Sequence, residues 1–245
     1  SDSDGGDTFG TDTPRYDITF SDTKAATELK TATQDFSLNF FKTIAKENAE
    51  LNSDGNFCVS PFSAAVCLGI ALNGAAGSTY TEIQNTLGYA GMSSEQINAY
   101  IKTILTEFPK LDGRTDLAIA NSMWAKSGCS FLDNFVSVNR SNYDAELQDN
   151  QPFDATTLNK INSWCSDKTK KLIPKILEQI PGDVQVYLLN AVYFKGMWKS
   201  RFNESDTKDK PFYTADGTAL SVKTMYQQGN FGCYIDDKMS VVELP

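Results

Sequence analysis

Two serine–lysine pairs have the spacing of a catalytic pair. Ser21 with Lys24, and Ser205 with Lys208, show the Ser-x-x-Lys arrangement in which a lysine activates a serine nucleophile. Both pairs lie in polar segments, whereas an activating lysine has to be buried so that its pKa falls. The chain has no His, which excludes Ser-His-Asp and Cys-His catalysis and histidine zinc sites. We therefore predict that the chain is not an enzyme.

Cofactor and metal motifs are also missing from the sequence. The segment from Gly69 to Gly74 has the glycine spacing of a phosphate loop but lacks the lysine that should follow. The Asp-rich start departs from the order of a calcium loop. The five Cys form no C-x-x-C pair, and four of them sit beside apolar or aromatic residues, as small core residues do. We predict no metal, no cofactor and no particular disulfide.

The charge balance narrows the range of partners. The 245 residues include 22 Lys and Arg against 31 Asp and Glu, a formal net charge of −9. This argues against nucleic-acid binding, which needs clustered cations, and against adsorption to an anionic membrane. Six Asp and one Arg fall in residues 1–23. We predict an acidic disordered tether over residues 1–15 and a single domain portion over 16–245.

Two helices open that domain, and the second is predicted at its centre. Apolar spacing predicts a long amphipathic helix over 21–48, with Ser21 as its N-cap. A second helix, 61–72, begins with Ser60-Pro61 and is apolar almost all round; no charged residue occurs between Gly55 and Thr81. Because Pro61 and several polar residues interrupt this stretch, we predict a buried core helix rather than a membrane span.

The remaining pattern is typical of an α+β protein, with helices in the first half and antiparallel strands in the last quarter. A capping box at Thr79–Glu82 and another at Ser93–Gln96 predict helix starts. The strand 184–194 is apolar on both sides, which predicts a place inside a covered sheet. The further predicted elements are helices over 131–143 and 158–172, a strand over 117–123 with Asn121 inside it, a hairpin about Asp216-Gly217, and strands near 229–235 and 240–244.

Three sequence blocks together resemble one family, the serpins, over about residues 20–245. The runs 56–63 (NFCVSPFS) and 73–83 (NGAAGSTYTEI) resemble the serpin signature around its buried second helix. Residues 161–164 (INSW), with Thr169 and 171–173 (KLI), resemble the helix that lies across the main sheet. The run 189–198 (LNAVYFKGMW), with Phe202 after it, resembles the strand and turn that follow.

The resemblance implies a serpin fold, several helices packed on three β-sheets. It also implies a proteinase inhibitor that works once: a reactive loop is cleaved and inserts into the main sheet, a kinetic trap. Ser60, Ser63 and Asn190 match the family's shutter, a polar cluster under the sheet centre, and Trp198 matches the breach, where the loop enters. The plain alternatives are an ordinary N-cap, an ordinary strand Asn and a core Trp at a strand end.

The sequence also departs from the family. It stops at residue 245, before the C-terminal reactive loop, so the reactive bond is unknown and we expect the C-terminal remainder of the same serpin as a partner. The other expected partners are target proteases of the serine or cysteine class. The start of the chain resembles the stretch after the lipidated Cys in bacterial surface lipoproteins. It predicts an extracellular or cell-surface protein, lipid-anchored upstream of Ser1.

Three functions remain open on the sequence. The leading one is irreversible inhibition of extracellular serine or cysteine proteases. The second is a non-inhibitory serpin acting as carrier, chaperone or storage protein. The third, a surface lipoprotein that binds carbohydrate or protein, is disfavoured because Trp124, Trp164 and Trp198 lie in core-like segments. The sequons at Asn139 and Asn203 matter only in a eukaryotic secretory pathway.

Overall fold

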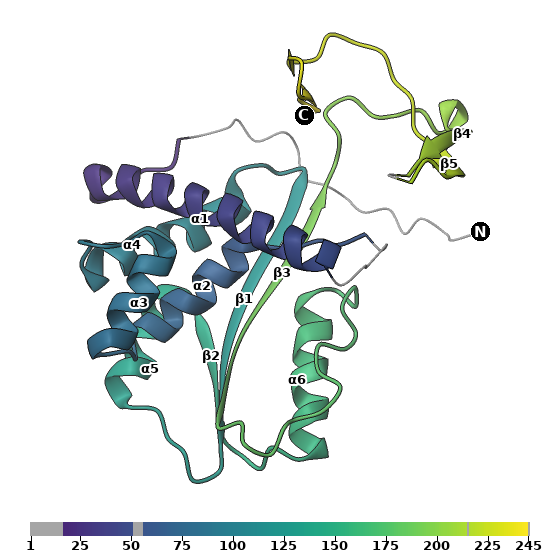
Figure 1. Ribbon diagram of the computed structural model, residues 1–245. Helices are drawn as coiled ribbons and strands as arrows, with labels where there is room; N and C mark the ends of the chain where they lie inside the picture. Colours follow the sequence, from purple (N-terminus) through teal and green to yellow (C-terminus); the bar gives the residue numbers. More distant parts are fainter. Residues whose placement is uncertain (1–16, 51–55, 215, 245) are drawn as a thin grey trace. The chain divides into compact units, whose positions relative to one another are not determined.

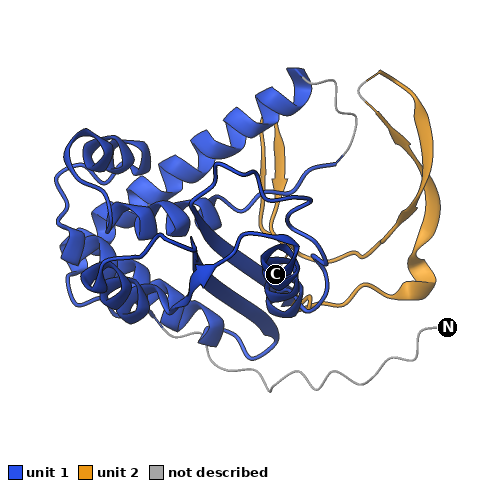
Figure 2. Cartoon of the chain, turned by 90° about the horizontal axis from the view of Figure 1, so that it is seen from below, with its two compact units in different colours: residues 1–195 blue, residues 196–245 orange. Residues whose placement is uncertain are grey.

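The computed structural model describes residues 17–50, 56–214 and 216–244. The predicted acidic tether, residues 1–15, lies outside the described residues, as does the predicted turn at Asp54-Gly55. The chain divides into two compact units, Ser1–Lys195 and Gly196–Pro245 (Figure 2).

The first unit contains the described α-helices and nearly all of the three-stranded sheet formed by β1, β2 and β3 (Figure 1). Its elements are, in chain order, α1 (Thr23–Glu50), α2 (Pro61–Leu72), α3 (Gly77–Leu87), α4 (Ser94–Glu107), η1 (Phe108–Lys110), β1 (Thr115–Lys126), α5 (Asp133–Tyr143), β2 (Ala145–Gln151), α6 (Ala155–Lys168) and β3 (Val186–Gly196). The second unit contains η2 (Glu204–Asp206), β4 (Lys208–Tyr213), β5 (Ala219–Thr224), β6 (Cys233–Ile235) and β7 (Ser240–Val242).

The helix starts follow local capping chemistry, with two corrections. Asp22 rather than Ser21 caps α1, because its Oδ1 accepts a 2.9 Å hydrogen bond from the Ala25 N–H. Helix α3 begins at Gly77 after Ala76, which makes no side-chain cap, so the capping box predicted at Thr79 is wrong. The capping box of Ser93 and Gln96 at the start of α4 is confirmed.

Helix α2 is the buried core helix that the sequence predicts. None of its residues is exposed, and it packs among α1, α3, α4 and α5. A Cβ at Gly69 would lie 2.7 Å from Tyr143 Oη and 3.0 Å from Ile101 Cδ1, so only glycine fits this close approach. Among the described residues, no helix is both long and apolar enough to cross a membrane.

The main sheet of the first unit has the strand order β2-β1-β3. Strand β2 pairs in parallel with β1, in register from Asn121 opposite Ala145. Strand β3 runs opposite to β1, since the Lys126 N–H at the end of β1 donates to Gln185 O just before β3 (3.0 Å). Among the described residues β3 is therefore an edge strand, not the inner strand that its apolar sequence predicts. Strand β2 is not among the strands predicted from the sequence, because its polar residues give no strand pattern.

The two faces of this sheet are covered by different helices (Figure 1). On one face, Met123, Leu147 and Leu188 join the large core of α1 to α5. On the other, Trp124, Leu189 and Ala191 join a small core with Ile161, Trp164 and Cys165 of α6. Successive side chains of each strand thus point to opposite faces of the sheet, as the pleat of a strand requires.

The second unit consists of two antiparallel hairpins, β4 with β5 and β6 with β7. The hairpin predicted about Asp216-Gly217 is confirmed, with Phe212 opposite Leu220. Large apolar side chains of this unit are nevertheless exposed: Phe212, Tyr213, Leu220, Met225, Tyr226, Tyr234, Ile235, Met239, Val241, Val242 and Leu244. A two-stranded hairpin has too little area to bury such residues by itself.

Candidate functional site

Ser60 and Ser63 form a hydrogen-bonded pair at the start of α2. Ser60 is the N-cap, and its Oγ accepts from the Ser63 N–H at 3.2 Å. Ser63 Oγ lies 2.9 Å from Ser60 Oγ and donates to it. Pro61 follows at the first helical position, where its missing N–H costs nothing. The pair therefore explains why α2 begins where it does.

Asn190 lies in β3 on the face that α2 covers. Its Nδ2 donates to Asn121 Oδ1 at 2.8 Å, and Asn121 Nδ2 donates to the Tyr143 carbonyl at 2.7 Å. Asn190 Oδ1 is buried and has no hydrogen-bond partner within the described part of the chain. A buried amide oxygen without a donor is costly, so this atom is an unsatisfied acceptor in the polar contacts of the strand.

The structure does not join these three residues by hydrogen bonds within the described ranges. Ser60 bonds Ser63, and Asn190 bonds Asn121. Helix α2 approaches β3 two residues away, where Cys67 Sγ lies 4.0 Å from Leu188 O. The shutter role of Ser60, Ser63 and Asn190 stays a prediction. Asn121 was not predicted as the partner of Asn190. It occupies a position of the strand 117–123 at which the alternation calls for an apolar, inward-facing residue, and an Asn there indicates a buried amide.

A network of buried amides continues from this point into the helices. Asn73 Nδ2, at the end of α2, donates to Asn98 Oδ1 of α4 (3.1 Å) and to Asn139 Oδ1 of α5 (3.0 Å). Tyr143 Oη donates to Asn98 Oδ1 at 2.9 Å. Asn139 is fully buried, so its sequon is not accessible in the folded chain. These bonds tie three helices to the sheet through one polar cluster.

Burial changes the ionisation of the groups on this face. It raises the pKa of the Cys67 thiol to about 11, so Cys67 is protonated and is no nucleophile at neutral pH. It also raises the pKa of Tyr89 to about 12, an effect that the hydrogen bond between the Tyr89 and Thr33 hydroxyls partly opposes. The pKa of Tyr143 rises for the same reason. At neutral pH all three side chains are therefore uncharged, and they contribute packing and hydrogen bonds.

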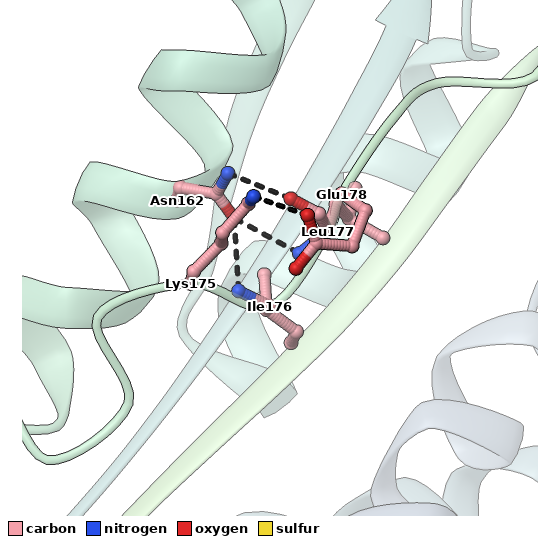
Figure 3. A network of polar contacts seen from close by, with 5 residues as sticks. All are labelled: Asn162, Lys175, Ile176, Leu177 and Glu178. Atoms are coloured by element: carbon pink, nitrogen blue, oxygen red, sulfur yellow. Dashed lines mark hydrogen bonds and ion pairs between the residues drawn. The ribbon is translucent and has the colours of Figure 1, made fainter.

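The opposite face is fastened by α6 and the linker that follows it. Asn162 of α6 holds this linker (Figure 3): its Oδ1 accepts from the Ile176 and Leu177 N–H groups, both at 2.9 Å, and its Nδ2 donates to Leu177 O at 2.9 Å. Lys175 and Glu178 form an ion pair beside these bonds. One side chain thus replaces the backbone partners that the linker lacks.

Charged contacts join the same helix to the strands. Glu146 of β2 accepts from Trp164 Nε1 at 3.2 Å and pairs with Lys168. Lys170, just after α6, pairs with Asp116 of β1, and its ammonium lies 4.6 Å from the centroid of the Tyr193 ring in β3. No local sequence pattern indicates these contacts, since each joins residues far apart in the chain.

Trp198, the predicted breach residue, lies in the second unit. Its ring meets the Phe202 ring edge-on at 5.7 Å, and 42% of the residue is exposed. Trp124 and Trp164 are buried, but the expectation that Trp198 belongs to a core is wrong for the described residues, because only Phe202 stacks against it. Its role in loop entry stays a prediction.

The cysteines also differ from expectation. Only Cys165 is buried; Cys67 and Cys129 are half-buried, and Cys58 and Cys233 are exposed. Apolar neighbours in sequence therefore did not place most of them in a core. Within residues 17–50, 56–214 and 216–244, no group of three His, Cys, Asp or Glu residues could hold a metal ion.

The comparisons with known proteins match this architecture. Residues 31–245 match the family model described as serpin, serine protease inhibitor. Leukocyte elastase inhibitor A of Rattus norvegicus is 30% identical over 224 residues, 89% of this chain and 58% of that protein. Antithrombin-III of Mus musculus is 29% identical over 89% of this chain and 48% of its own length.

A solved structure shows the same fold. Ovalbumin from emu, Dromaius novaehollandiae, superposes with a TM-score of 0.79 at 26% identity, over 89% of this chain and 60% of that one. The chain thus spans about 58% of the rat relative's length. The order of helices and sheets, the motifs around α2, α6 and β3 and the match over residues 31–245 lead to one conclusion. The chain belongs to the serpin family.

Proposed function

We propose that the whole protein is an irreversible, single-use inhibitor of serine proteases. The observation that carries this proposal is the match of residues 31–245 to the serine protease inhibitor family. The 30% identity to rat leukocyte elastase inhibitor A supports it. Extracellular proteases are the proposed targets, and cysteine proteases are the second class to test.

The sheet of the first unit suits the proposed trap. Strand β3 has 11 residues and, within the described residues, a strand neighbour on one side only. Its other edge carries backbone N–H and C=O groups that an added strand can pair with. Helix α2 and the amide network support one face of β3, so an incoming strand meets a fixed edge.

The covalent step of the proposed mechanism takes place at the reactive bond of the serpin loop. The serine Oγ of the protease attacks the carbonyl carbon of the reactive bond, an ester forms, and the peptide nitrogen leaves as a new amine. In the proposed mechanism the loop then enters the sheet before water hydrolyses the ester. Strand insertion releases free energy that the active form had stored, which makes the trap kinetic rather than reversible.

The remainder of the serpin is the other proposed partner. The second unit exposes many large apolar side chains, among them Phe212, Tyr234 and Ile235. Exposed apolar area of this kind marks a surface that another part of a protein covers. We propose that the C-terminal part of the serpin packs here, so that the hairpins complete their sheets.

The proposed location of the protein is the cell surface. It is supported by the six Asp within residues 1–23, a composition that suits a solvated spacer between an anchor and a folded domain. Digestion of intact cells with an added protease should remove the protein if it is surface-exposed. Protection from digestion in intact cells, with cleavage after lysis, would place it inside the cell instead.

The test of inhibition uses the protein expressed from its complete reading frame. It is incubated with elastase-, trypsin- and chymotrypsin-type serine proteases and with papain-type cysteine proteases, then boiled and run on a denaturing gel. We expect a covalent complex with at least one serine protease, and a cleaved form that melts at a higher temperature than the intact one. The same protease with its active serine blocked is the control and should give neither product.

One result of this experiment would contradict inhibition. Cleavage without a covalent complex and without a rise in melting temperature would overturn the inhibitor proposal. It would favour a carrier, chaperone or storage serpin, which needs no loop insertion. A complex with papain-type proteases alone would change the target class and leave the trapping mechanism in place.

A further inference from the structure

The end of α6 and the turn after it contact the three strands β1, β2 and β3 of the described sheet through two lysines. Lys168 pairs with Glu146 of β2, and Lys170 pairs with Asp116 of β1. The Lys170 ammonium also lies 4.6 Å from the Tyr193 ring centroid in β3, within the range of a cation–π contact. Lys170 is thus a single side chain that contacts two neighbouring strands at once.

The backbone at Lys170 is unusual. Its φ is +48°, and the φ of Lys171 is +68°, in the left-handed region that residues other than glycine rarely adopt. The turn is closed by the Lys171 N–H, which donates to Ser166 O at 2.7 Å. Two successive non-glycine residues in this conformation indicate that tertiary contacts hold the helix end in place.

Asp116 and Tyr193 mark the same end of two adjacent strands. Strands β1 and β3 run in opposite directions, and Asn121 pairs with Asn190 midway along them. Asp116 is the second residue of β1, and Tyr193 lies three residues before the end of β3. Lys170 therefore fastens the pair at the end from which the chain leaves β3, whereas Asn162 holds the linker that leads into β3.

We propose that Lys170 is a positioning residue that fastens α6 and its linker across β1 and β3, and so limits opening of the sheet at the β3 edge. Leu177 and Ile180 of the linker pack on the small core under α6, on the face of β3 that carries Leu189 and Ala191. When Lys170 is released, the linker loosens and the β3 backbone opens more often. The consequence for loop insertion rests on the proposed function; the fastening itself does not.

The contacts are of the kind that salt weakens. The Lys170 and Asp116 side chains are 54% and 40% exposed, so the ion pair is partly screened by water and ions. An exposed ion pair and a cation–π contact each change an equilibrium only a few-fold. The expected effect is therefore a moderate, salt-dependent change in opening rather than loss of the fold.

The experiment measures amide hydrogen exchange of residues 172–196 in the protein from its complete reading frame, with no protease present. Lys170→Gln should raise exchange in β3 and the linker about fivefold at low salt. Lys170→Arg, which keeps the charge, should stay within about twofold of the parent. In about 1 M NaCl the difference between Lys170→Gln and the parent should shrink below about twofold.

Lys171 provides the matched control. It is the neighbouring lysine, also has positive φ, and forms no ion pair in the described part of the chain, so Lys171→Gln changes the same chemistry without the contact. Asp116→Asn breaks the ion pair from the strand side but keeps the cation–π contact with Tyr193, so it should raise exchange in the same segments by less than Lys170→Gln does. Equal exchange in Lys170→Gln and Lys171→Gln, or a difference that persists in 1 M NaCl, would overturn the proposal.

A second readout separates this inference from the function. If the protein traps proteases, Lys170→Gln should change the number of inhibitor molecules consumed per protease trapped, and Lys171→Gln should not. If the protein traps none, the function proposal fails, while faster exchange in Lys170→Gln still supports the fastening. Unchanged exchange beside normal trapping defeats only the fastening.

Discussion

The two faces of the β2-β1-β3 sheet are held by different chemistry. On the α2 face, buried amides and tyrosines of α2, α4 and α5 meet Asn121 and Asn190 of the strands. On the α6 face, a core of six buried residues is supplemented by half-exposed lysines paired with Glu146 and Asp116. The same sheet thus has a neutral, buried side and a charged, partly solvated side.

The difference assigns distinct roles to the two faces. A buried hydrogen-bonded amide network is insensitive to salt, and breaking it leaves unpaired polar groups inside the protein. Exposed ion pairs are weak and respond to salt. We infer that the α2 face is the fixed platform of the sheet and that the α6 face is the side that loosens.

The largest expected change in unfolding free energy comes from replacing two fully buried isoleucines, one for each face. Ile70→Ala in α2 should cost about 4 kcal/mol of unfolding free energy, because the surrounding helices prevent collapse of the cavity. Ile161→Ala in α6 should cost about 2 to 3 kcal/mol, because a helix held by a small core can shift inward. Urea titration of both variants measures the costs. Equal costs would contradict a stiffer α2 face.

Alkaline pH should destabilise the platform. The pKa of Tyr89 is about 12 in the folded chain, against about 10 for an unfolded tyrosine. Below pH 10 both states keep the proton; between pH 10 and 12 only the folded state does, so stability falls as pH rises. The loss from this group approaches roughly 2 to 3 kcal/mol.

Denaturant titration at pH 9 and pH 11.5 checks this fall. Tyr89→Phe should make it shallower, leaving the parts due to Cys67, whose pKa is raised to about 11, and to Tyr143, whose pKa is also raised by burial. Tyr213→Phe, at an exposed tyrosine, is the control and should leave the slope unchanged. A steep fall that survives in Tyr89→Phe would show that other groups dominate.

The amide network should fail when its link to the sheet is removed. Asn121→Ala leaves Asn190 Nδ2 without its acceptor and Tyr143 O without its donor, a cost of about 2 kcal/mol. Asn85→Ala, at an exposed helix position, should change stability by less than about 0.5 kcal/mol. The loss should be the same in 0.1 and 1 M NaCl; strong salt dependence would undermine the neutral-platform view.

The predicted shutter residues give a smaller effect on stability. Ser60→Ala removes the N-cap of α2 and should cost about 1 kcal/mol. If Ser60, Ser63 and Asn190 act together as a shutter, each Ala variant should also polymerise faster on mild heating, as size-exclusion chromatography would show. Ser93→Ala, which removes the cap of α4, is the matched control. Polymerisation that merely follows stability, equal for Ser60→Ala and Ser93→Ala, would reject the assignment.

The smallest effect belongs to the α6 face. Glu146→Gln removes the charge that pairs with Lys168 but keeps an acceptor for Trp164 Nε1. The expected cost is about 0.5 kcal/mol at low salt and near zero in 1 M NaCl, since both side chains are partly exposed. Thermal melts at the two salt concentrations measure it. A cost above about 2 kcal/mol at high salt would make this face as rigid as the other.

The sequence by itself determined the elements that local chemistry specifies. Ser60-Pro61 began α2, Ser93 and Gln96 capped α4, and Asp216-Gly217 turned the β4–β5 hairpin. These features depend on residues within a few positions of one another, so no distant partner is needed to predict them. The motifs around α2, α6 and β3 likewise indicated the family, which the match over residues 31–245 confirms.

Only the tertiary structure decided the contacts between distant segments. Strand β2 has polar residues and becomes a strand because β1 lies beside it. Asn190 meets Asn121 across 69 positions, and Lys170 meets Asp116 across 54. Trp198 is exposed because burial depends on neighbours that its own segment does not contain. Such pairings follow from strand register and helix docking, which a local pattern does not encode.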